Sequence, residues 1–221
     1  MSSNIATPST TNRQGKMSEK SQRTQQKLLE SGAHLFSTYG YNATTTRNVE
    51  THAKVQRNLI SYHFGGKEAF WKFCVSDLFE RFSNAIQPAL EQSKDIESGE
   101  RIRFLIRQSV RASAAYPEVM RIMFDEGRCN DWRLEWITER YTRKLYSTVR
   151  QLFDDGQACG VLPKINYMQF YYVLVSGGAM FAMAPEYRLL SGEDPCNEIN
   201  VDAQANAIAQ LLAPRLNEEN L

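Results

Sequence analysis

The sequence predicts an all-α protein made of a small basic front domain and a larger helical bundle behind it. Apolar residues recur at three- and four-residue spacing along most of the chain, and the alternation with turn pairs that marks strands is missing. Charge separates the two parts. Residues 1–67 carry nine Lys and Arg against three Glu, a net charge of +6, whereas the other 154 residues carry −5. A basic front suggests contact with a polyanion, although chance clustering would give the same count.

The chain divides into three predicted segments. Residues 1–17 are mostly Ser, Thr, Asn and Gln with almost nothing to bury, which predicts a disordered tail. Residues 18–67 form the predicted front domain and residues 68–221 the rear domain. A chain of 221 residues is long enough to bury an adequate core without disulfides.

The composition also argues against several classes of protein. The N-terminal residues lack the apolar region of a signal peptide, and no run approaches the roughly 20 apolar residues of a membrane span. The four cysteines are scattered, without a C-x-x-C pair or a nearby His at ligand spacing. We therefore expect a cytoplasmic protein with no membrane segment, no metal and no cofactor.

The front domain is predicted to contain three helices, and its punctuating residues set their limits. Gly40 stands where a helix C-cap glycine belongs. Thr44 and Thr45 can cap a second, short helix, and a turn at Lys54 separates it from a third. The predicted ranges are 18–40, 46–53 and 56–63.

The rear domain is predicted to be a bundle whose helices are limited mainly by prolines and caps. Pro88 and Pro185 are expected to end helices, and Pro117 suits a first helical position. Asn166 and Gln169 make a capping box. The predicted ranges are about 67–88, 100–115, 117–126, 132–158, 166–184 and 201–216.

Two short helices joined by a tight turn, preceded by a longer helix in a basic segment, are typical of a helix-turn-helix DNA reader. The major groove admits one helix, so the second short helix must present an outward face while its other face is anchored. Here Arg57, Asn58 and Ser61 can face outward while Leu59 and Ile60 anchor the helix. Arg and Asn can contact guanine and adenine through paired hydrogen bonds, each worth about 1–3 kcal/mol of discrimination.

The segment "LLESGAHLFSTYGYNATTTRNVETHAKVQRNLISYHFGGKEAF", residues 28–70, resembles the DNA-binding domain of the TetR/AcrR family of bacterial transcriptional regulators. The elements that carry the resemblance are F-x-x-x-G-Y at the end of the first helix, T-T-T-R at the entry to the second, and Y-H-F-x-x-K-E after the third. The resemblance implies a three-helix helix-turn-helix domain joined through a fourth helix to a larger helical bundle. It also implies a homodimer that binds a near-palindromic double-stranded DNA operator and releases it when a small molecule enters the rear domain.

The resemblance implies two kinds of DNA contact. The reading positions, which set the operator sequence, correspond to Gln56, Arg57, Asn58 and Leu59, and Arg47 corresponds to a position that reaches a base in some members. The backbone contacts, which position the protein without reading sequence, correspond to Thr45, Thr46, Ser61, Tyr62, His63 and Lys67.

Two residues depart from the family pattern. Lys54 replaces the usual glycine of the turn, so a left-handed conformation there costs about 1 kcal/mol. Ser61 replaces an aromatic residue and leaves only a hydroxyl for a smaller backbone contact.

Several residues also allow a purely structural interpretation. His63 could be a half-buried histidine that covers Phe64; a catalytic role finds no acid or nucleophile at a spacing that would orient the ring. The threonines at 44–46 could act only as a cap. Gly65-Gly66-Lys67 lacks the other residues of a phosphate-binding P-loop and is interpreted as the joint to the fourth helix.

The rear domain is predicted to bind a small hydrophobic effector and to form the dimer. Its aromatic and Met stripes could be plain core, or they could line an apolar cavity. The candidate cavity residues are Met120, Met123, Phe124, Trp136, Tyr171 and Phe181. Small residues inside an apolar run favour close helix packing, either within the chain or across the last two long helices of a dimer. The candidate interface residues are Gly177, Gly178, Ala205, Ile208 and Leu212.

The sequence therefore predicts a homodimeric, ligand-responsive transcriptional repressor and not an enzyme. An activator, or a DNA-bound architectural protein without an effector, is the alternative on the same fold. A helical enzyme or a protein-binding adaptor would need a polar cluster in a cleft, and the sequence offers none.

Overall fold

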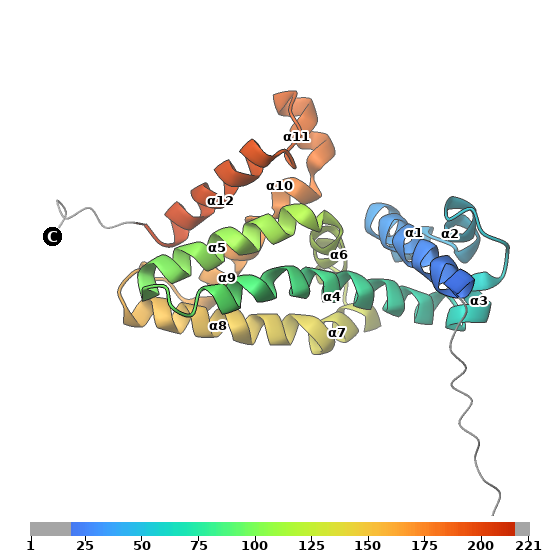
Figure 1. Ribbon diagram of the computed structural model, residues 1–221, viewed down its shortest axis with the longest axis horizontal. Coiled ribbons are helices and arrows are strands. Elements are labelled where there is room, and N and C mark those ends of the chain that lie inside the picture. Colours follow the sequence, from blue (N-terminus) through green and yellow to red (C-terminus); the bar gives the residue numbers. More distant parts are fainter. Residues whose placement is uncertain (1–18, 215–221) are drawn as a thin grey trace, which may run out of the picture.

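In the computed structural model of the protein, which describes residues 19–214, every regular element within that range is a helix (Figure 1). The predicted tail at 1–17 lies outside the described residues. The front of the molecule consists of α1 (Glu19–Ala43), α2 (Thr46–His52) and α3 (Leu59–Phe64). The long helix α4 (Lys67–Gln92) leaves this front and runs along the body of the molecule.

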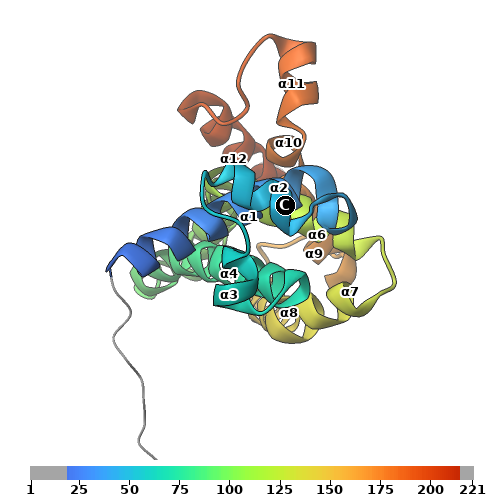
Figure 2. The ribbon, with the colours of Figure 1, turned by 90° about the vertical axis from the view of Figure 1, so that its right-hand side faces the viewer.

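The remaining helices form the rear bundle. The helix α12 packs along α5, and α4 and α8 lie on the other side of α5 (Figure 1). Figure 2 shows α11 standing away from the rest of the bundle. The bounds are α5 (Ser98–Ala115), α6 (Pro117–Gly127), α7 (Trp132–Ile137), the π-helical turn η1 (Thr138–Thr142), α8 (Arg143–Ala158), α9 (Tyr167–Ser176), α10 (Ala179–Ala182), α11 (Ala184–Ser191) and α12 (Glu198–Leu212).

Adjacent threonines fix the start of α2. The Thr45 hydroxyl accepts a hydrogen bond from the backbone N–H of Asn48 at 3.1 Å, which caps the helix. The Thr44 hydroxyl is buried and donates to the backbone carbonyl of Leu35 at 3.1 Å. One threonine therefore begins α2 while its neighbour ties that beginning to α1.

One predicted helix end is confirmed and another is wrong. Gly40 has non-helical backbone angles, with φ of 77° and ψ of 167°, so the first helix breaks there as predicted, and a short helical segment continues α1 to Ala43. Helix α4 passes through Pro88 and ends at Gln92. A proline removes only one backbone donor, and beyond it Ala89 is buried and its carbonyl accepts from the N–H of Ser93 at 3.1 Å. Packing of the following turn thus outweighs the loss at Pro88.

The predicted helix at 166–184 is also wrong, because the chain divides there into α9, α10 and α11. Gly177 and Gly178 interrupt the helix. Pro185 stands in the first turn of α11, so it begins a helix that the sequence did not predict. The last helix begins at Glu198, earlier than predicted, because Asn197 caps it by accepting from the N–H of Asn200 at 2.8 Å.

Two hydrophobic clusters hold the molecule together. The first joins the front helices to α4, α6 and α7, and the second fills the rear between α5, α8, α9 and α12. Trp71 of α4 is almost fully buried in the first cluster, with its ring centroid 5.3 Å from that of Trp132 and 5.6 Å from that of Trp136. The ring centroid of Tyr41, near the end of α1, lies 5.7 Å from that of Trp132, so an aromatic contact and not only the chain connection fixes the front helices to the rear bundle.

Candidate nucleic-acid interface

The helix α3 has one buried and one exposed face. Ile60 and Phe64 are buried in the first cluster, whereas Asn58, Ser61 and Tyr62 are exposed. Tyr62 has 80% of its surface exposed, an unusual position for a large aromatic side chain. A face of this kind is available to an external partner.

A carboxylate from α2 holds the start of α3. Asn58, the N-cap residue, makes no side-chain cap. Instead Glu50, which is only 5% exposed, accepts a hydrogen bond from the backbone N–H of Ile60 at 2.9 Å. No sequence pattern assigns a role to Glu50, although it is the only acidic residue between Glu30 and Glu68 and stands in a basic segment. This isolation is the signal that could have pointed to it.

The turn between α2 and α3 contains two non-glycine residues in the left-handed region. Lys54 has φ of 55° and Asn58 has φ of 66°. Asn tolerates this conformation better than most residues, whereas Lys is strained by its Cβ. The turn therefore carries the strain that the replacement of glycine by Lys54 predicts.

Lys54→Gly is expected to raise the free energy of unfolding by about 1 kcal/mol, because glycine adopts the left-handed conformation without strain. Urea unfolding measures the change. Lys164→Gly is the matched control, since Lys164 is exposed in a loop and has no positive φ; it should be neutral or slightly destabilising. Equal effects of the two changes would contradict the strain at Lys54.

The predicted reading positions lie on the turn and at the start of α3. Gln56, Arg57 and Asn58 are exposed, and Leu59 is partly buried against the first cluster. At the start of α2, Arg47 is exposed and Thr46 is half-buried. Four of these polar side chains are therefore exposed, while Leu59 serves mainly as an anchor.

His63 is half-buried and is held by α1. Its Nδ1 atom lies 3.3 Å from the side-chain nitrogen of Gln25, and its ring packs edge-on against Tyr62 and Phe64. When the Gln25 amide donates, the His63 proton sits on Nε2. The structural interpretation of His63 as a cover for Phe64 and the interpretation as a DNA backbone contact are compatible with this position.

Lys67, at the start of α4, lies over the ring of Tyr41. Its ammonium nitrogen is 4.3 Å from the ring centroid, a cation–π contact. Burial, helped by the nearby guanidinium of Arg133, lowers the pKa of Lys67. Gly65 and Gly66, with φ of 86° and 152°, form the joint before it. Because a helix and not a strand precedes this joint, the geometry differs from that of a P-loop.

The rear bundle contains an open cavity of about 640 Å³ between α6, the α7 to α8 segment and α9. Of the six predicted cavity residues, Met123, Phe124 and Tyr171 line it. The other three lie elsewhere: Trp136 packs on Trp71, and Met120 and Phe181 are buried.

The five predicted interface residues are buried inside a single chain. Ala205, Ile208 and Leu212 belong to the second cluster. A Cβ on Gly177 would lie 3.0 Å from Ile208, and one on Gly178 would lie 2.7 Å from the Cβ of Ser113. The glycines therefore let α12 and α5 approach closely within the chain.

Residues 19–214 contain neither a membrane-spanning helix nor a metal-binding group. No helix in that range is long and apolar enough to cross a membrane. No three His, Cys, Asp or Glu side chains gather there in a way that could hold a metal ion.

Comparison with known proteins identifies the front helices. The family described as bacterial regulatory proteins, tetR family, matches residues 28–72. A relative from Bacillus subtilis (strain 168), named "Probable HTH-type transcriptional regulator YttP", is 22% identical over 134 residues. The match covers 61% of this chain and 65% of the relative, slightly less than two thirds of the relative's length.

Solved structures share the fold of most of the chain. A Clostridium perfringens protein named for the regulation of fatty acid metabolism is similar with a TM-score of 0.68 at 15% identity, covering 87% of this chain and 100% of that one. The fatty acid degradation regulator FadR from Bacillus halodurans is similar with a TM-score of 0.59 at 13% identity, covering 89% and 95%. The helix-turn-helix geometry and the family match agree: residues 28–72 are similar to the tetR family of bacterial regulatory proteins, and the larger part of the chain shares the fold of these solved structures.

Proposed function

We propose that the protein is a ligand-responsive repressor that binds a palindromic DNA operator as a homodimer in the bacterial cytoplasm. The single observation that carries the DNA-binding role is the exposed face of α3, which the buried Glu50 carboxylate fixes in place. A helix held this way keeps its outward side chains in a constant orientation, which is what reading a major groove requires.

The exposed residues divide between reading and positioning. Arg57 and Asn58, with Gln56 beside them, supply the polar groups that recognise base edges. Tyr62 and His63 on α3, and Thr45 and Thr46 at the start of α2, contact the DNA backbone in this proposal, whereas Arg47 reaches a base. Lys67, at the start of α4, contacts a phosphate from its place beside the Tyr41 ring.

The homodimer is supported by an apolar stripe on α12 that no part of residues 19–214 covers. The stripe consists of four exposed residues spaced four apart, Ile199, Ala203, Ala207 and Leu211, and 69% of the surface of Leu211 is exposed. On α9, Val173 is also exposed. Exposed apolar surface of this kind marks an interface, and a second copy would place two α3 helices about 35 Å apart, one turn of DNA.

Leu211→Glu is expected to convert the dimer to a monomer and to weaken operator binding at least 100-fold, because it places a charge inside the proposed interface. Light scattering after gel filtration measures the mass. Ala85→Glu, at an exposed position of α4, is the matched control and should leave the dimer intact. A dimer that survives Leu211→Glu would exclude this stripe as its interface.

A ligand-responsive role is supported by the cavity, which opens beside α6, and by the extensive contact of α6 with α1. A ligand that favours one position of α6 would change the spacing of the two α3 helices only if it binds that arrangement more tightly. No separate observation favours an activator, or a protein without an effector, over the repressor.

DNA binding is tested by fluorescence anisotropy with the DNA upstream of the protein's own gene and with a shuffled duplex. The salt concentration is varied from about 50 to about 200 mM, a range over which binding through phosphate contacts weakens steeply. We expect tighter binding to the upstream DNA. Arg57→Ala should reduce the preference for that sequence, whereas Lys67→Ala should weaken binding to both duplexes and reduce the salt slope by about two for a dimer. Binding that is equal for both duplexes and insensitive to salt would contradict the proposal.

A further inference from the structure

The cavity between α6, α8 and α9 has apolar walls. The side chains that share this character are Met123, Phe124, Leu134, Ile137, Met168 and Val175. Thioethers and aromatic rings adapt to the shape of a bound molecule, so the body of a ligand for this cavity is a hydrocarbon. A volume of about 640 Å³ lies within the range of small-molecule sites.

One residue of the cavity lining, Tyr171, carries a buried hydroxyl that is unused. Tyr171 is only 5% exposed, and its phenol oxygen has no hydrogen-bond partner among the described residues. Burial raises the pKa of Tyr171, so the phenol stays protonated and keeps its O–H as a donor. A buried donor without a partner is unfavourable, and a ligand atom that accepts its hydrogen bond would correct this.

The charge that the cavity offers is positive. Arg128 and Arg143 both line it. Arg128 pairs with Asp125 and Arg143 pairs with Glu139, each one turn earlier, and neither acid lines the cavity. Exposed pairs of this kind are weak, and a guanidinium has five donors. The acidic lining residue, Glu126, is already engaged by Arg133 with 2.8 Å between Oε2 and Nε.

We propose that the cavity binds an amphipathic monocarboxylic acid. Its hydrocarbon body lies along the apolar walls, and its carboxylate accepts hydrogen bonds from the Tyr171 hydroxyl and from the Arg128 and Arg143 side of the cavity. The assignment rests on the proposed function in that it names the effector of the repressor, but binding of the acid can be measured without DNA.

Calorimetry on the full chain with dodecanoate, dodecanol and dodecylammonium tests the chemical class, since the three probes share one hydrocarbon body. We expect dodecanoate to bind at least 10-fold more tightly than dodecanol, and dodecylammonium to bind most weakly. A cation that binds as tightly as the carboxylate, or three equal affinities, would overturn the assignment. Binding of dodecanoate without release of the operator would leave the site assigned and would contradict the repressor role.

Variants of the lining test the contacts separately. Tyr171→Phe should weaken both dodecanoate and dodecanol, because both accept from the hydroxyl. The double change Arg128→Gln and Arg143→Gln should weaken dodecanoate alone, to about the affinity of the alcohol. Arg150→Gln is the control, since Arg150 is an exposed arginine of the same helix α8 that pairs with Asp154 and does not line the cavity. Unchanged affinity of the double variant would remove the arginines from the site.

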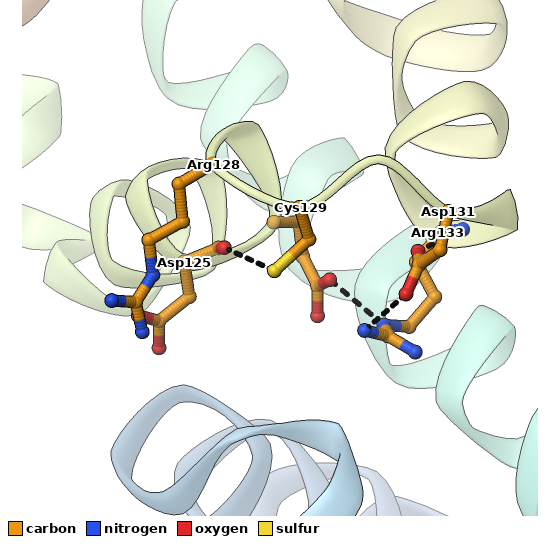
Figure 3. A network of polar contacts seen from close by, with 6 residues as sticks. Asp125, Arg128, Cys129, Asp131 and Arg133 are labelled. Atoms are coloured by element: carbon orange, nitrogen blue, oxygen red, sulfur yellow. Dashed lines mark hydrogen bonds and ion pairs between the residues drawn. The ribbon is translucent and has the colours of Figure 1, made fainter.

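A second observation concerns a buried arginine between the cavity and the DNA-binding face. Arg133 is 7% exposed, and its guanidinium pairs with Glu126 at 2.8 Å and with Asp131 at 2.6 Å. Figure 3 shows this corner between α6 and α7, with Asp131 and Arg133 facing each other. The guanidinium carbon also lies 4.7 Å from the ring centroid of Tyr41.

The Tyr41 ring therefore contacts two cations, Arg133 from the rear bundle and Lys67 from the start of α4. At the other end, Glu126 lines the cavity. A continuous series of contacts thus runs from the cavity wall through Glu126, Arg133 and Tyr41 to Lys67. Ion pairs and ring contacts of this kind carry coupling when they have two discrete arrangements.

We infer that Arg133 is a positioning residue for Lys67, acting through the Tyr41 ring. The guanidinium fixes the ring, and the ring fixes where the Lys67 ammonium stands relative to a DNA phosphate. A change at Glu126 on the cavity wall would then alter the DNA contact without any change in α3.

A double-mutant cycle on operator affinity tests this role. Because Arg133→Met alone leaves the Glu126 carboxylate buried without a partner, which destabilises the fold, it is combined with Glu126→Gln. Lys67→Ala should weaken operator binding about 10-fold in the wild-type background and less than 3-fold in the background of the paired change. The same cycle with Arg150→Gln should be additive. Additive effects at positions 67 and 133 would overturn the inference.

Discussion

Gly32→Ala is expected to lower the free energy of unfolding by about 3 kcal/mol, the upper part of the range for overpacking. Gly32 lies in α1 where it crosses α4. An added Cβ would stand 2.5 Å from the sulfur of Cys74 and 2.6 Å from the ring of Phe70, both buried. Neither neighbour has free space to move into, because the front cluster is filled with aromatic rings.

Gly127→Ala is the matched control for this change. Gly127 is also helical, but a Cβ there has nothing within 4 Å. It should stabilise the protein by up to about 1 kcal/mol, because alanine loses less backbone freedom than glycine in a helix. Urea unfolding followed by tryptophan fluorescence measures both variants. A Gly32→Ala protein as stable as the wild type would show that α1 and α4 do not pack this closely.

Glu50→Ala is expected to lower the free energy of unfolding by about 2 kcal/mol and to abolish measurable operator binding. The change leaves the N–H of Ile60 buried without an acceptor, which costs about 1–3 kcal/mol. It also releases the start of α3 from α2, so the exposed residues lose their fixed orientation. Glu50→Gln should keep part of both properties, since its amide oxygen can still accept the bond.

Glu30→Ala separates this effect from a change of net charge. Glu30 is an exposed residue of α1, so its removal changes the charge equally without touching α3. We expect unfolding and operator binding close to those of the wild type. If Glu30→Ala and Glu50→Ala weaken DNA binding equally, the hydrogen bond to Ile60 does not orient the helix.

The sequence predicted the front of the molecule well because its signals are local. Thr45 as a helix cap and Lys54 as a strained turn residue each depend on a few neighbouring residues. Glu50 was missed for the opposite reason. Its partner, Ile60, is ten residues away on another helix, and periodicity gives no indication that a charged side chain turns inward.

The rear was less predictable because packing against distant segments decides its details. Gly177 and Gly178 interrupt α9 where α12 and α5 approach, and neither contact is visible in the local pattern. The same contacts bury Ala205, Ile208 and Leu212 inside one chain. The cavity depends on which sides of three helices meet, so only Met123, Phe124 and Tyr171 of the predicted residues reach it.

The π-helical turn η1 has a consequence for the phase of the helix that contains it. Along the continuous segment from α7 to α8, five residues whose sequence separations are multiples of four turn toward the interior: Arg133, Ile137, Tyr141, Val149 and Phe153. An α-helix rotates by about 100° per residue, so five steps of four would drift about 200° from the starting face. One extra residue in a π turn takes back about 100° of that drift. The continuous helical segment from α7 to α8 can therefore contribute side chains to both hydrophobic clusters. Arg143 and Tyr146 face the cavity, while Trp136 packs against the first cluster.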